Sequence, residues 1–300
     1  MDYISYQQTP LQPIRHPLLT EKRVSLIVKR EDLNHPHVSG NKWWKLKYNV
    51  LQAAETNSKI LTFGGAFSNH IYATAAATNI LKMPSIGVIR GEMTLPLNHT
   101  LHFAQTQGMK LHFVSREEYK TAKHRIALSL EEKRGECFVI PEGGSNVHAV
   151  RGVAEFASTL PGNFDYVVLP VGTGGTMAGL ICGFTGSSRL LGISVLKNGG
   201  FLNGEIEKLC VELNSRSNNN WTILTEYHHG GYAKVTNDLL RFIETMSHYS
   251  LPLDHVYTGK ALYAVLEEVR KGNIKPGSSI LFIHTGGLQG SFRVKDLEQH

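Results

Sequence analysis

The sequence lacks the features of a secreted, membrane-bound or disulfide-rich protein. It has only three cysteines, and Cys137, Cys182 and Cys210 are too few and too widely spaced for a disulfide framework or a zinc site, so we expect reduced thiols. No stretch approaches the roughly eighteen uncharged apolar residues of a membrane-spanning helix, and no basic segment followed by an apolar run opens the chain. We therefore expect a cytoplasmic protein with neither a membrane partner nor a metal.

A strong charge of either sign is also missing. The net charge is +6 over 300 residues, and the tightest basic run, from Lys42 to Lys47, is short. This disfavours a nucleic-acid partner, whereas an anionic small molecule satisfies the same charge balance. With 41% hydrophobic and 19% charged residues, the composition is that of an ordinary globular enzyme.

What the sequence does contain is a regular alternation of strand and helix patterns after a polar, proline-rich segment over 1–23. The expected strands are 24–30, 59–63, 85–90, 110–114, 137–140, 165–171, 190–196, 221–225 and 279–284. The expected helices are the stretch after Asn41, the Ala-rich stretch ending at Leu81, 97–107, 116–134, 147–160, 177–184, 204–213, 234–248 and 260–271. This order predicts an α/β fold with parallel-sheet cores, helices on both faces and a cleft between two sheets.

One lysine lies in an unusual position. Ser39 and Gly40 form a turn, Asn41 can cap a helix, and Lys42 then falls in the first helical turn. The positive end of a helix disfavours a cation. Lys42 is therefore either a solvated lysine or an amine whose lowered pKa suits it to form a Schiff base with a carbonyl cofactor. This stretch alone leaves both interpretations open.

Two further turns follow predicted strands and open helices. The segment 172–176, Gly-Thr-Gly-Gly-Thr, is typical of loops that present backbone amides and hydroxyls to a phosphate, but it matches neither a Walker loop nor the full Rossmann spacing. In the segment 67–70, Ser68 and Asn69 can hold a carboxylate or simply cap a helix. Each of these turns alone could be purely structural. The combination of a candidate lysine, a phosphate site and a carboxylate site favours a ligand-binding role for all three.

Six segments, taken in order, resemble a known enzyme family: 39–42, 64–70, 142–146, 172–180, 256–261 and 284–287. They resemble the pyridoxal-phosphate-dependent enzymes grouped as 1-aminocyclopropane-1-carboxylate deaminase and D-cysteine desulfhydrase, over roughly residues 24–295. The resemblance implies the tryptophan synthase β-like fold, fold type II. It also implies a large cofactor-binding domain from 1–47 and 157–300, a smaller inserted α/β domain from 48–156, and a homodimer.

The resemblance implies roles for individual residues. Lys42 would be the Schiff-base lysine of pyridoxal 5'-phosphate, and Ser68, Asn69 and His70 would face the cofactor and the carboxylate of a small amino-acid substrate. The cofactor phosphate would lie against Gly172, Thr173, Gly174, Gly175 and Thr176. Around the cofactor ring would lie Tyr257, Thr258 at the ring nitrogen, and Tyr232 as a second active-site tyrosine. The expected catalytic residues are Lys42, Ser68 and Tyr257.

Thr258 favours one reaction of this family over another. The deaminase branch carries a glutamate at this point and the desulfhydrase branch a threonine, and a neutral hydroxyl cannot hold a proton on the ring nitrogen by charge. The sequence thus favours a lyase of the D-cysteine desulfhydrase type, which eliminates the β substituent to give sulfide, ammonia and pyruvate. A 1-aminocyclopropane-1-carboxylate deaminase and a non-catalytic cofactor-binding protein stay as alternatives.

Some residues depart from the family pattern. Ser39 replaces the usual glycine, and Trp43 and Trp44 stand where smaller or basic residues are more common. The two tryptophans either reshape the mouth of the site or pack in the core. His228 and His229 are either ligands or acids, or exposed loop residues.

Overall fold

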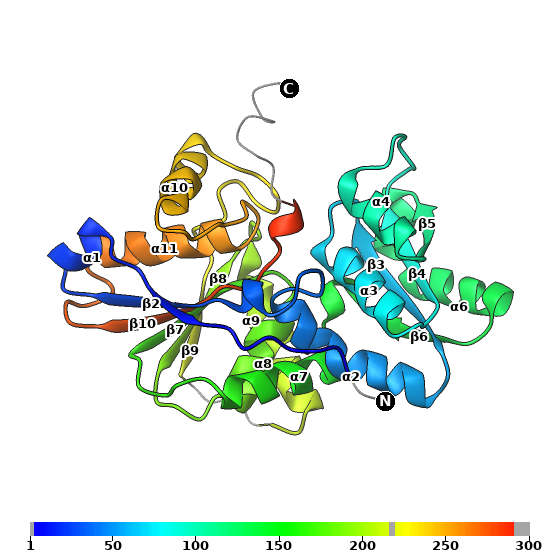
Figure 1. Cartoon of the computed structure of the whole chain (residues 1–300), viewed down its shortest axis with the longest axis horizontal. Coiled ribbons are helices and arrows are strands. Elements are labelled where there is room, and N and C mark those ends of the chain that lie inside the picture. The colour runs from blue at the N-terminus through cyan, green and yellow to red at the C-terminus, as the bar shows by residue number, and fades with distance from the viewer. Residues whose placement is uncertain (1–2, 216–219, 291–300) are drawn as a thin grey trace.

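The computed structural model describes residues 3–215 and 220–290, which form two β-sheets (Figure 1). The larger sheet has the strand order β1 (Leu11–Pro13), β2 (Ser25–Lys29), β10 (Ser279–Ile283), β7 (Tyr166–Val171), β8 (Arg189–Ser194) and β9 (Trp221–Leu224). Only β1 pairs antiparallel within it. The smaller sheet is all parallel, in the order β5 (Lys110–Val114), β4 (Ser85–Arg90), β3 (Lys59–Gly65) and β6 (Cys137–Ile140).

Helices cover both faces of the larger sheet (Figure 1). One face carries α1 (Pro17–Glu21), α10 (Asn237–Ser247) and α11 (Thr258–Arg270), and the other carries α2 (Asn41–Glu55), α7 (Val147–Ser158), α8 (Gly175–Gly183) and α9 (Leu202–Glu212). In β7, Val168 packs in the cluster that contains Leu262 of α11, whereas Val167 packs in the cluster that contains Met177 of α8. Both faces of the strand are therefore buried, as a parallel sheet requires.

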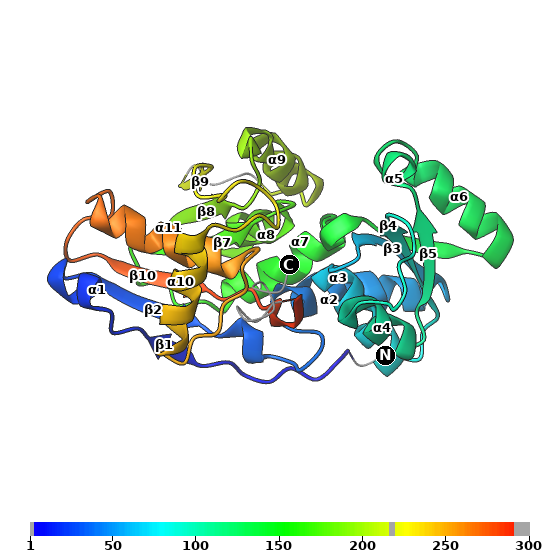
Figure 2. The ribbon, with the colours of Figure 1, turned by 90° about the horizontal axis from the view of Figure 1, so that it is seen from above.

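The smaller sheet is sandwiched in the same way. One face packs against α3 (Asn69–Ile80) and α4 (His99–Thr106), through Ile71 and Leu101. The other face packs against α5 (Arg116–Thr121) and α6 (Lys123–Arg134), through Tyr119 and Leu130. Short 3-10 helices lie at Glu31–Leu33 (η1), Glu142–Gly144 (η2), Gly199–Phe201 (η3) and Leu288–Gly290 (η4). In both views η4 lies between the two sheets (Figures 1 and 2).

The predicted fold class, two parallel-sheet cores with helices on both faces, is confirmed. The elements also follow the predicted order, with boundaries that shift by a few residues. The three cysteines are free. Among the described residues, the helices are all too short or too polar to span a bilayer.

The segment 1–23, for which the sequence pattern predicted no element, contains β1 and α1, and Pro17 is tolerated in the first turn of α1 because a missing N–H costs nothing there. One local prediction was wrong. The expected helix over 116–134 is two helices, since the backbone of Ala122, at φ −126° and ψ 18°, leaves the helical region between them. A capping box between Ser115 and Glu118 fixes the start of the first.

The proposed domain boundaries stay a prediction. All strands of the smaller sheet lie within 48–156, and all strands of the larger sheet lie outside it. The helices α2 and α7 each cross a proposed boundary, after residue 47 and after residue 156. Residues 291–295, which belong to the span of the resemblance, lie outside the described residues.

Candidate active site

A cavity of about 350 Å³ opens at the carboxyl ends of strands from both sheets. Its lining comes from the segments that follow β3, β4, β6, β7 and β10, and from the start of α2. Parallel α/β sheets place their loops at this edge, and ligands bind there. The cavity therefore lies where the alternation of strands and helices predicted a cleft.

The turn before α2 fits against the segment after β10 without room for a side chain. Gly40 has φ +67°, and a Cβ on it would lie 1.9 Å from the carbonyl oxygen of Thr285. The Asn41 N–H donates to that same oxygen at 3.1 Å. Gly40 is the N-cap of α2 and no side chain caps the helix, so the prediction that Asn41 is the cap is wrong.

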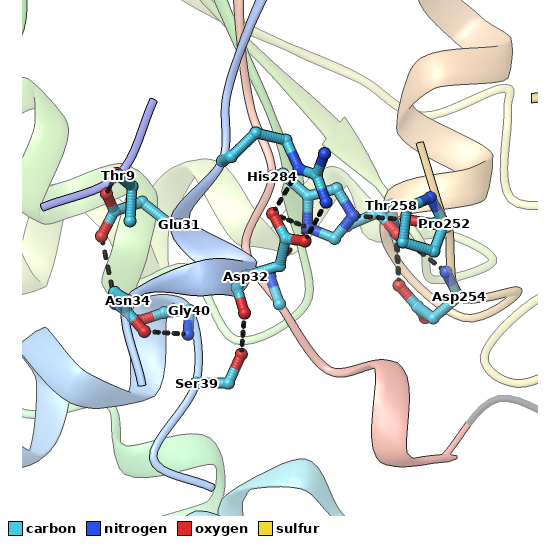
Figure 3. Close-up of polar contacts among 12 residues, drawn as sticks. Thr9, Glu31, Asp32, Asn34, Ser39, Gly40, Pro252, Asp254, Thr258 and His284 are labelled. Atoms are coloured by element: carbon cyan, nitrogen blue, oxygen red, sulfur yellow. Dashed lines mark hydrogen bonds and ion pairs between the residues drawn. The ribbon is translucent and has the colours of Figure 1, made fainter. Parts of the chain in front are cut away.

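A buried polar network holds this turn in place (Figure 3). Asn34 Nδ2 donates to the carbonyl of Gly40 at 3.0 Å, and Asn34 Oδ1 accepts from the Gly40 N–H at 2.9 Å. Ser39 Oγ donates to the carbonyl of Asp32 at 3.1 Å, and Glu31 accepts from Asn34 Nδ2 at 3.1 Å. Buried polar groups are costly unless paired, so this network fixes the backbone that precedes Lys42.

Lys42 is half-buried at the bottom of the cavity. Its Nζ donates to Asn41 Oδ1 at 2.9 Å, and Asn41 Nδ2 donates to Thr176 Oγ1 at 2.9 Å, which joins the start of α2 to α8. Burial lowers the pKa of Lys42 to about 8, although the Asp254 carboxylate opposes this shift. The solvated-lysine interpretation does not fit these surroundings, which suit a nucleophilic amine.

A second lysine lies one helical turn away. Lys45 is buried, and its Nζ donates to the carbonyl of Gly143 at 2.6 Å and to Ser145 Oγ at 2.9 Å. Burial, and then the charge of Lys42, lower its pKa well below the usual range. Ser145 Oγ lies 2.5 Å from Thr173 Oγ1, so this cation lies directly beside the glycine loop.

The glycine loop joins β7 to α8 as the sequence predicts. Gly174, in the left-handed region at φ +81°, is the N-cap of α8, and no side chain caps the helix. Uncapped first-turn amides, together with Lys45, make a suitable site for an anion. Gly172, Thr173, Gly174 and Thr176 line the cavity, whereas Gly175 does not. A Cβ on Gly175 would lie 2.6 Å from Ser145 Oγ.

The turn after β3 brings Ser68 and Asn69 to the opposite side of the cavity. Ser68 is the N-cap of α3 and accepts from the Ile71 N–H at 3.3 Å, which leaves its hydroxyl hydrogen available. Asn69 Oδ1 accepts a hydrogen bond from Gln289 Nε2 at 2.8 Å. The Nδ2 donor of Asn69 therefore points away from Gln289. Both capping and ligand binding are thus compatible with Ser68, and the two residues offer donors to a carboxylate.

His70 presents an unused acceptor. Its Nε2 lies 2.7 Å from Thr62 Oγ1, whose own hydrogen goes to the carbonyl of Ile140 at 2.9 Å, so the imidazole hydrogen is on Nε2. Burial, followed by the charges of Lys42 and Lys45, lowers the His70 pKa well below its usual range and keeps the ring neutral. The buried Nδ1 has no hydrogen-bond partner among the described residues, although His70 lines the cavity.

Tyr257 and Tyr232 meet at another side of the cavity. Their hydroxyl oxygens are 3.3 Å apart, and their ring centroids are 6.0 Å apart with the planes at 73°. Gly172 leaves room for Tyr257, since a Cβ there would lie 3.0 Å from Tyr257 Cε1. Burial raises the pKa of Tyr257 well above the usual range, so its hydroxyl stays a donor.

Thr258 is not among the residues that line the cavity. It is fully buried, its Oγ1 donates to Asp254 Oδ1 at 2.6 Å, and it accepts from the Asp254 N–H at 3.0 Å (Figure 3). Asp254 Oδ2 accepts from the N–H groups of Val256 and Tyr257 at 2.8 and 2.7 Å. The threonine and this aspartate thus form the cap of α11, and contact of Thr258 with a cofactor stays a prediction.

The residues whose roles were open lie away from the cavity. Trp43 and Trp44 are buried, and their indole N–H groups donate to the carbonyl of Ser5 and to Glu31 Oε2, so they pack in the core. His228 accepts from the Gly230 N–H within its own loop. The lining also contains residues that sequence analysis did not assign to the site: Lys45, Arg90, Glu142, Thr285 and Gln289.

A model of the family described as "Pyridoxal-phosphate dependent enzyme" matches residues 4–286. The chain belongs to this family. It is an enzyme with fold type II, and its cofactor is pyridoxal 5'-phosphate. Its relatives are named as deaminases and desulfhydrases, so it belongs with the pyridoxal-phosphate-dependent deaminases and lyases of small amino acids.

Three relatives illustrate this similarity. A protein of Pyrococcus horikoshii, provisionally named a 1-aminocyclopropane-1-carboxylate deaminase, is 31% identical over 96% of this chain and 92% of its own. The bifunctional D-cysteine desulfhydrase/1-aminocyclopropane-1-carboxylate deaminase of Arabidopsis thaliana is 32% identical over 89% of this chain and 73% of its own. A crystal structure of a 1-aminocyclopropane-1-carboxylate deaminase homologue superimposes with a TM-score of 0.85 at 30% identity, over 97% of this chain and 93% of the other.

The residues of the cavity fit pyridoxal 5'-phosphate. The compound carries an aldehyde, a phosphate and an aromatic ring. The cavity offers an amine of lowered pKa at Lys42, an uncapped helix start beside Lys45, and the aromatic ring of Tyr257 in its lining. Each chemical group of the cofactor therefore has a complementary group on the chain.

Proposed function

We propose that this enzyme eliminates the β substituent of a small amino acid, and that it converts D-cysteine to sulfide, ammonia and pyruvate. The observation that carries the proposal is the hydrogen bonding at the start of α11, where the residue after Tyr257 is the neutral Thr258. The Asp254 carboxylate there accepts four hydrogen bonds, from Thr258 N, Thr258 Oγ1, Val256 N and Tyr257 N. It is therefore committed to the start of α11, which supports a cofactor ring nitrogen that no carboxylate keeps protonated.

Lys42 would act as both the attachment point and the general base. When bound, pyridoxal 5'-phosphate supplies a ring that accepts the electron pair of the substrate α carbon. The Lys42 amine, with its pKa near 8, would take the α proton onto Nζ close to neutral pH. Thr173, Gly174 and the amides at the start of α8, with Lys45, would hold the phosphate.

The substrate would be oriented by the turn after β3. Ser68 Oγ and Asn69 Nδ2 each have a hydrogen that the capping and Gln289 contacts leave available for a carboxylate. His70 would accept from a donor group of the cofactor or the substrate through Nδ1. Tyr257 would pack against the ring, with Tyr232 beside it at the mouth.

The test is sulfide and pyruvate release from D-cysteine by the cofactor-loaded protein, beside L-cysteine and 1-aminocyclopropane-1-carboxylate. Stoichiometric sulfide and pyruvate from D-cysteine would support the proposal. Turnover of 1-aminocyclopropane-1-carboxylate to ammonia and 2-oxobutyrate, without sulfide from either cysteine, would replace it with the deaminase function that the names of the relatives support. No turnover of a broad amino-acid panel would favour the non-catalytic alternative.

The expected assembly follows from the resemblance, and the expected location from the absence of an export or membrane-spanning pattern in the sequence. We expect a homodimer, which light scattering after size exclusion would measure as twice 33.3 kDa. A cytoplasmic location also stays a prediction, and fractionation of cells that produce the native chain would test it.

A further inference from the structure

A second cavity, of about 650 Å³, adjoins the active site and is rich in positive charge. It shares Gly65, Arg90 and Glu142 with the active-site cavity. Its other polar lining residues are Arg116, Tyr119, Lys120 and Lys123, from α5 and the start of α6. We refer to these seven residues as the basic cavity.

Four cations face one carboxylate in the basic cavity. That carboxylate, Glu142, is already bound to Lys123, whose Nζ lies 2.6 Å from its Oε2. Within the described ranges, Arg90, Arg116 and Lys120 have no ion-pair partner. Scattered surface cations are ordinary, but three unbalanced ones around a cavity beside an active site attract an anion.

A buried phenol also lines the basic cavity. Tyr119 is 2% exposed, and no hydrogen bond of regular geometry satisfies its hydroxyl among the described residues, although the Glu142 carboxylate lies near it. The Arg90 guanidinium lies 5.6 Å from its ring centroid, and the Lys123 ammonium 4.5 Å. Burial, followed by the charge of Glu142, raises its pKa above the usual range, so the phenol stays a potential donor.

Arg90 connects the basic cavity to the reacting end of the site. It is the last residue of β4, and its Nη2 lies 3.3 Å from where a Cβ of Gly65 would be, so the missing side chain leaves the guanidinium room to lie beside β3. A third cavity, of about 430 Å³, brings Arg90 together with Ser68, Asn69 and Tyr257. A substrate carboxylate at Ser68 and Asn69 would thus leave its side chain directed at Arg90.

We propose that the basic cavity also admits amino acids whose side chain ends in an oxyanion, with a phosphate at the β carbon. This inference rests on the proposed β elimination and adds a second substrate class to the D-cysteine proposed above. Arg90 is the specificity-determining residue, because a guanidinium binds a tetrahedral oxyanion with two parallel hydrogen bonds. Arg116 and Lys120 add long-range attraction.

The reaction balances for O-phosphoserine as a representative of the class. The Cα–H bond breaks and its proton goes to Lys42 Nζ. The electron pair forms the Cα=Cβ bond as the Cβ–O bond breaks, and phosphate leaves with the bonding pair. The resulting 2-aminoacrylate takes up water and releases ammonia and pyruvate, so no oxidant or reductant is required.

The first test compares a charged with an uncharged side chain. We would measure pyruvate release from both enantiomers of O-phosphoserine and of β-chloroalanine, with the wild type, Arg90→Gln and the control Lys110→Gln. Lys110 begins β5, the strand next to β4, and pairs with Ile86 rather than with Arg90, at the amino ends of the two strands. We expect Arg90→Gln to lower kcat/KM for O-phosphoserine about 10- to 100-fold more than for β-chloroalanine, mainly through KM, and Lys110→Gln to leave the ratio unchanged.

The second test measures binding without turnover. We would titrate 3-phosphonopropionate, which has no amino group, into the cofactor-loaded protein by calorimetry, with propionate as the uncharged-tail control. The phosphonate should bind at least about tenfold tighter than propionate, and this advantage should disappear in Arg90→Gln and shrink in Arg116→Gln/Lys120→Gln. The double variant keeps the test decisive if Arg90→Gln fails to fold.

The outcomes separate this inference from the proposed function. No pyruvate from any of the four substrates, nor from D-cysteine run beside them, would overturn the β elimination itself. Pyruvate from β-chloroalanine with no preference for O-phosphoserine, or equal binding of phosphonopropionate and propionate, would overturn the role of the basic cavity and leave the elimination standing.

Discussion

The two sides of the active-site cavity differ in how closely their backbone is packed and in how many of their charged side chains are paired. On the side of the larger sheet, Gly40 lies against the backbone of Thr285, Gly172 against the ring of Tyr257 and Gly174 against the side chain of Ile206, and the polar groups of the Gly40 turn are paired. On the side of the smaller sheet, Arg90, Arg116 and Lys120 are exposed and lack ion-pair partners among the described residues, whereas Lys123 is paired with Glu142. The first side is closely packed and leaves mainly the first-turn amides of α8 without a side-chain cap, whereas the second keeps unpaired charged side chains.

This difference assigns different tasks to the two sides. Tight backbone contacts and filled hydrogen bonds suit a group that is the same in every catalytic cycle, as the cofactor is. Unbalanced long side chains suit a group that varies between substrates, because they move at little cost and add charge selectivity. Substitutions on the larger-sheet side should therefore harm folding or all turnover, and those on the smaller-sheet side should change substrate preference.

The largest effect is expected at Lys42. We expect Lys42→Ala to abolish covalent attachment of the cofactor and to lower turnover of any substrate by at least about 10²–10⁴-fold, the contribution of a general base. The measurement is borohydride reduction followed by peptide mass spectrometry, together with pyruvate release. The matched control is Lys47→Ala, on the same helix as Lys42, which loses an ion pair to Glu155 of α7. In this control the covalent attachment and the turnover should both persist.

A different attachment site would contradict this prediction. If the reduced cofactor is found on Lys45, the buried lysine one turn away, the roles of the two lysines are reversed. The structure argues against this result because the Lys45 ammonium is already bound to Gly143 and Ser145.

A matched glycine pair tests the contrast in packing. In Gly40→Ala the new Cβ would meet the backbone of Thr285 at 1.9 Å with φ at +67°, whereas in Gly65→Ala it would meet only Arg90 Nη2, at 3.3 Å. We expect Gly40→Ala to lower the free energy of unfolding by about 2–4 kcal/mol and Gly65→Ala by less than about 1 kcal/mol. Urea unfolding of both variants measures this, and similar losses would remove the proposed difference in packing.

The sequence predicted those parts of the site that depend on local structure. Lys42 and the loop 172–176 follow a turn or a strand and open a helix, so strand, glycine and helix signals within a few residues locate them. Lys45 could have been found too, because three residues from Lys42 on a helix places it on the same side. The pairing of Asp254 with Thr258, four positions later, was likewise available as a local side-chain pattern.

The smaller-sheet side could not be predicted in this way. Arg90, Glu142 and Tyr119 are far apart in sequence and come together only when β4, η2 and α5 are placed around one sheet edge. Exposed Arg and Glu are also the most ordinary of surface residues, so nothing local distinguishes them. Their grouping depends on strand order and on the approach of the two sheets, which local patterns do not encode.

The smallest effect is expected at Lys260, which supports Tyr232 from the larger-sheet side. Lys260 is fully buried, and its Nζ donates to the carbonyls of His228 and Gly231 at 2.9 and 2.7 Å, in the loop before Tyr232. Burial lowers its pKa from 10.5 to about 8, against the opposing charge of Asp254. Between these two values the unfolded chain binds a proton that the folded chain does not, so the free energy of unfolding should rise with pH from about 8 upward.

Urea unfolding of the cofactor-free protein between pH 8 and 9.5 measures this dependence. Lys42, whose pKa is also lowered, makes the free energy of unfolding rise with pH in the same range. The contribution of Lys260 is therefore the difference between the wild type and Lys260→Met. In Lys260→Met, we expect the slope of the unfolding free energy against pH to fall by up to about 1.4 kcal/mol per pH unit. In Lys110→Met, at an exposed position, the slope should not change. An unchanged slope in Lys260→Met would mean that Lys260 keeps its proton in the folded state, and its two carbonyl contacts would then be those of a permanent cation.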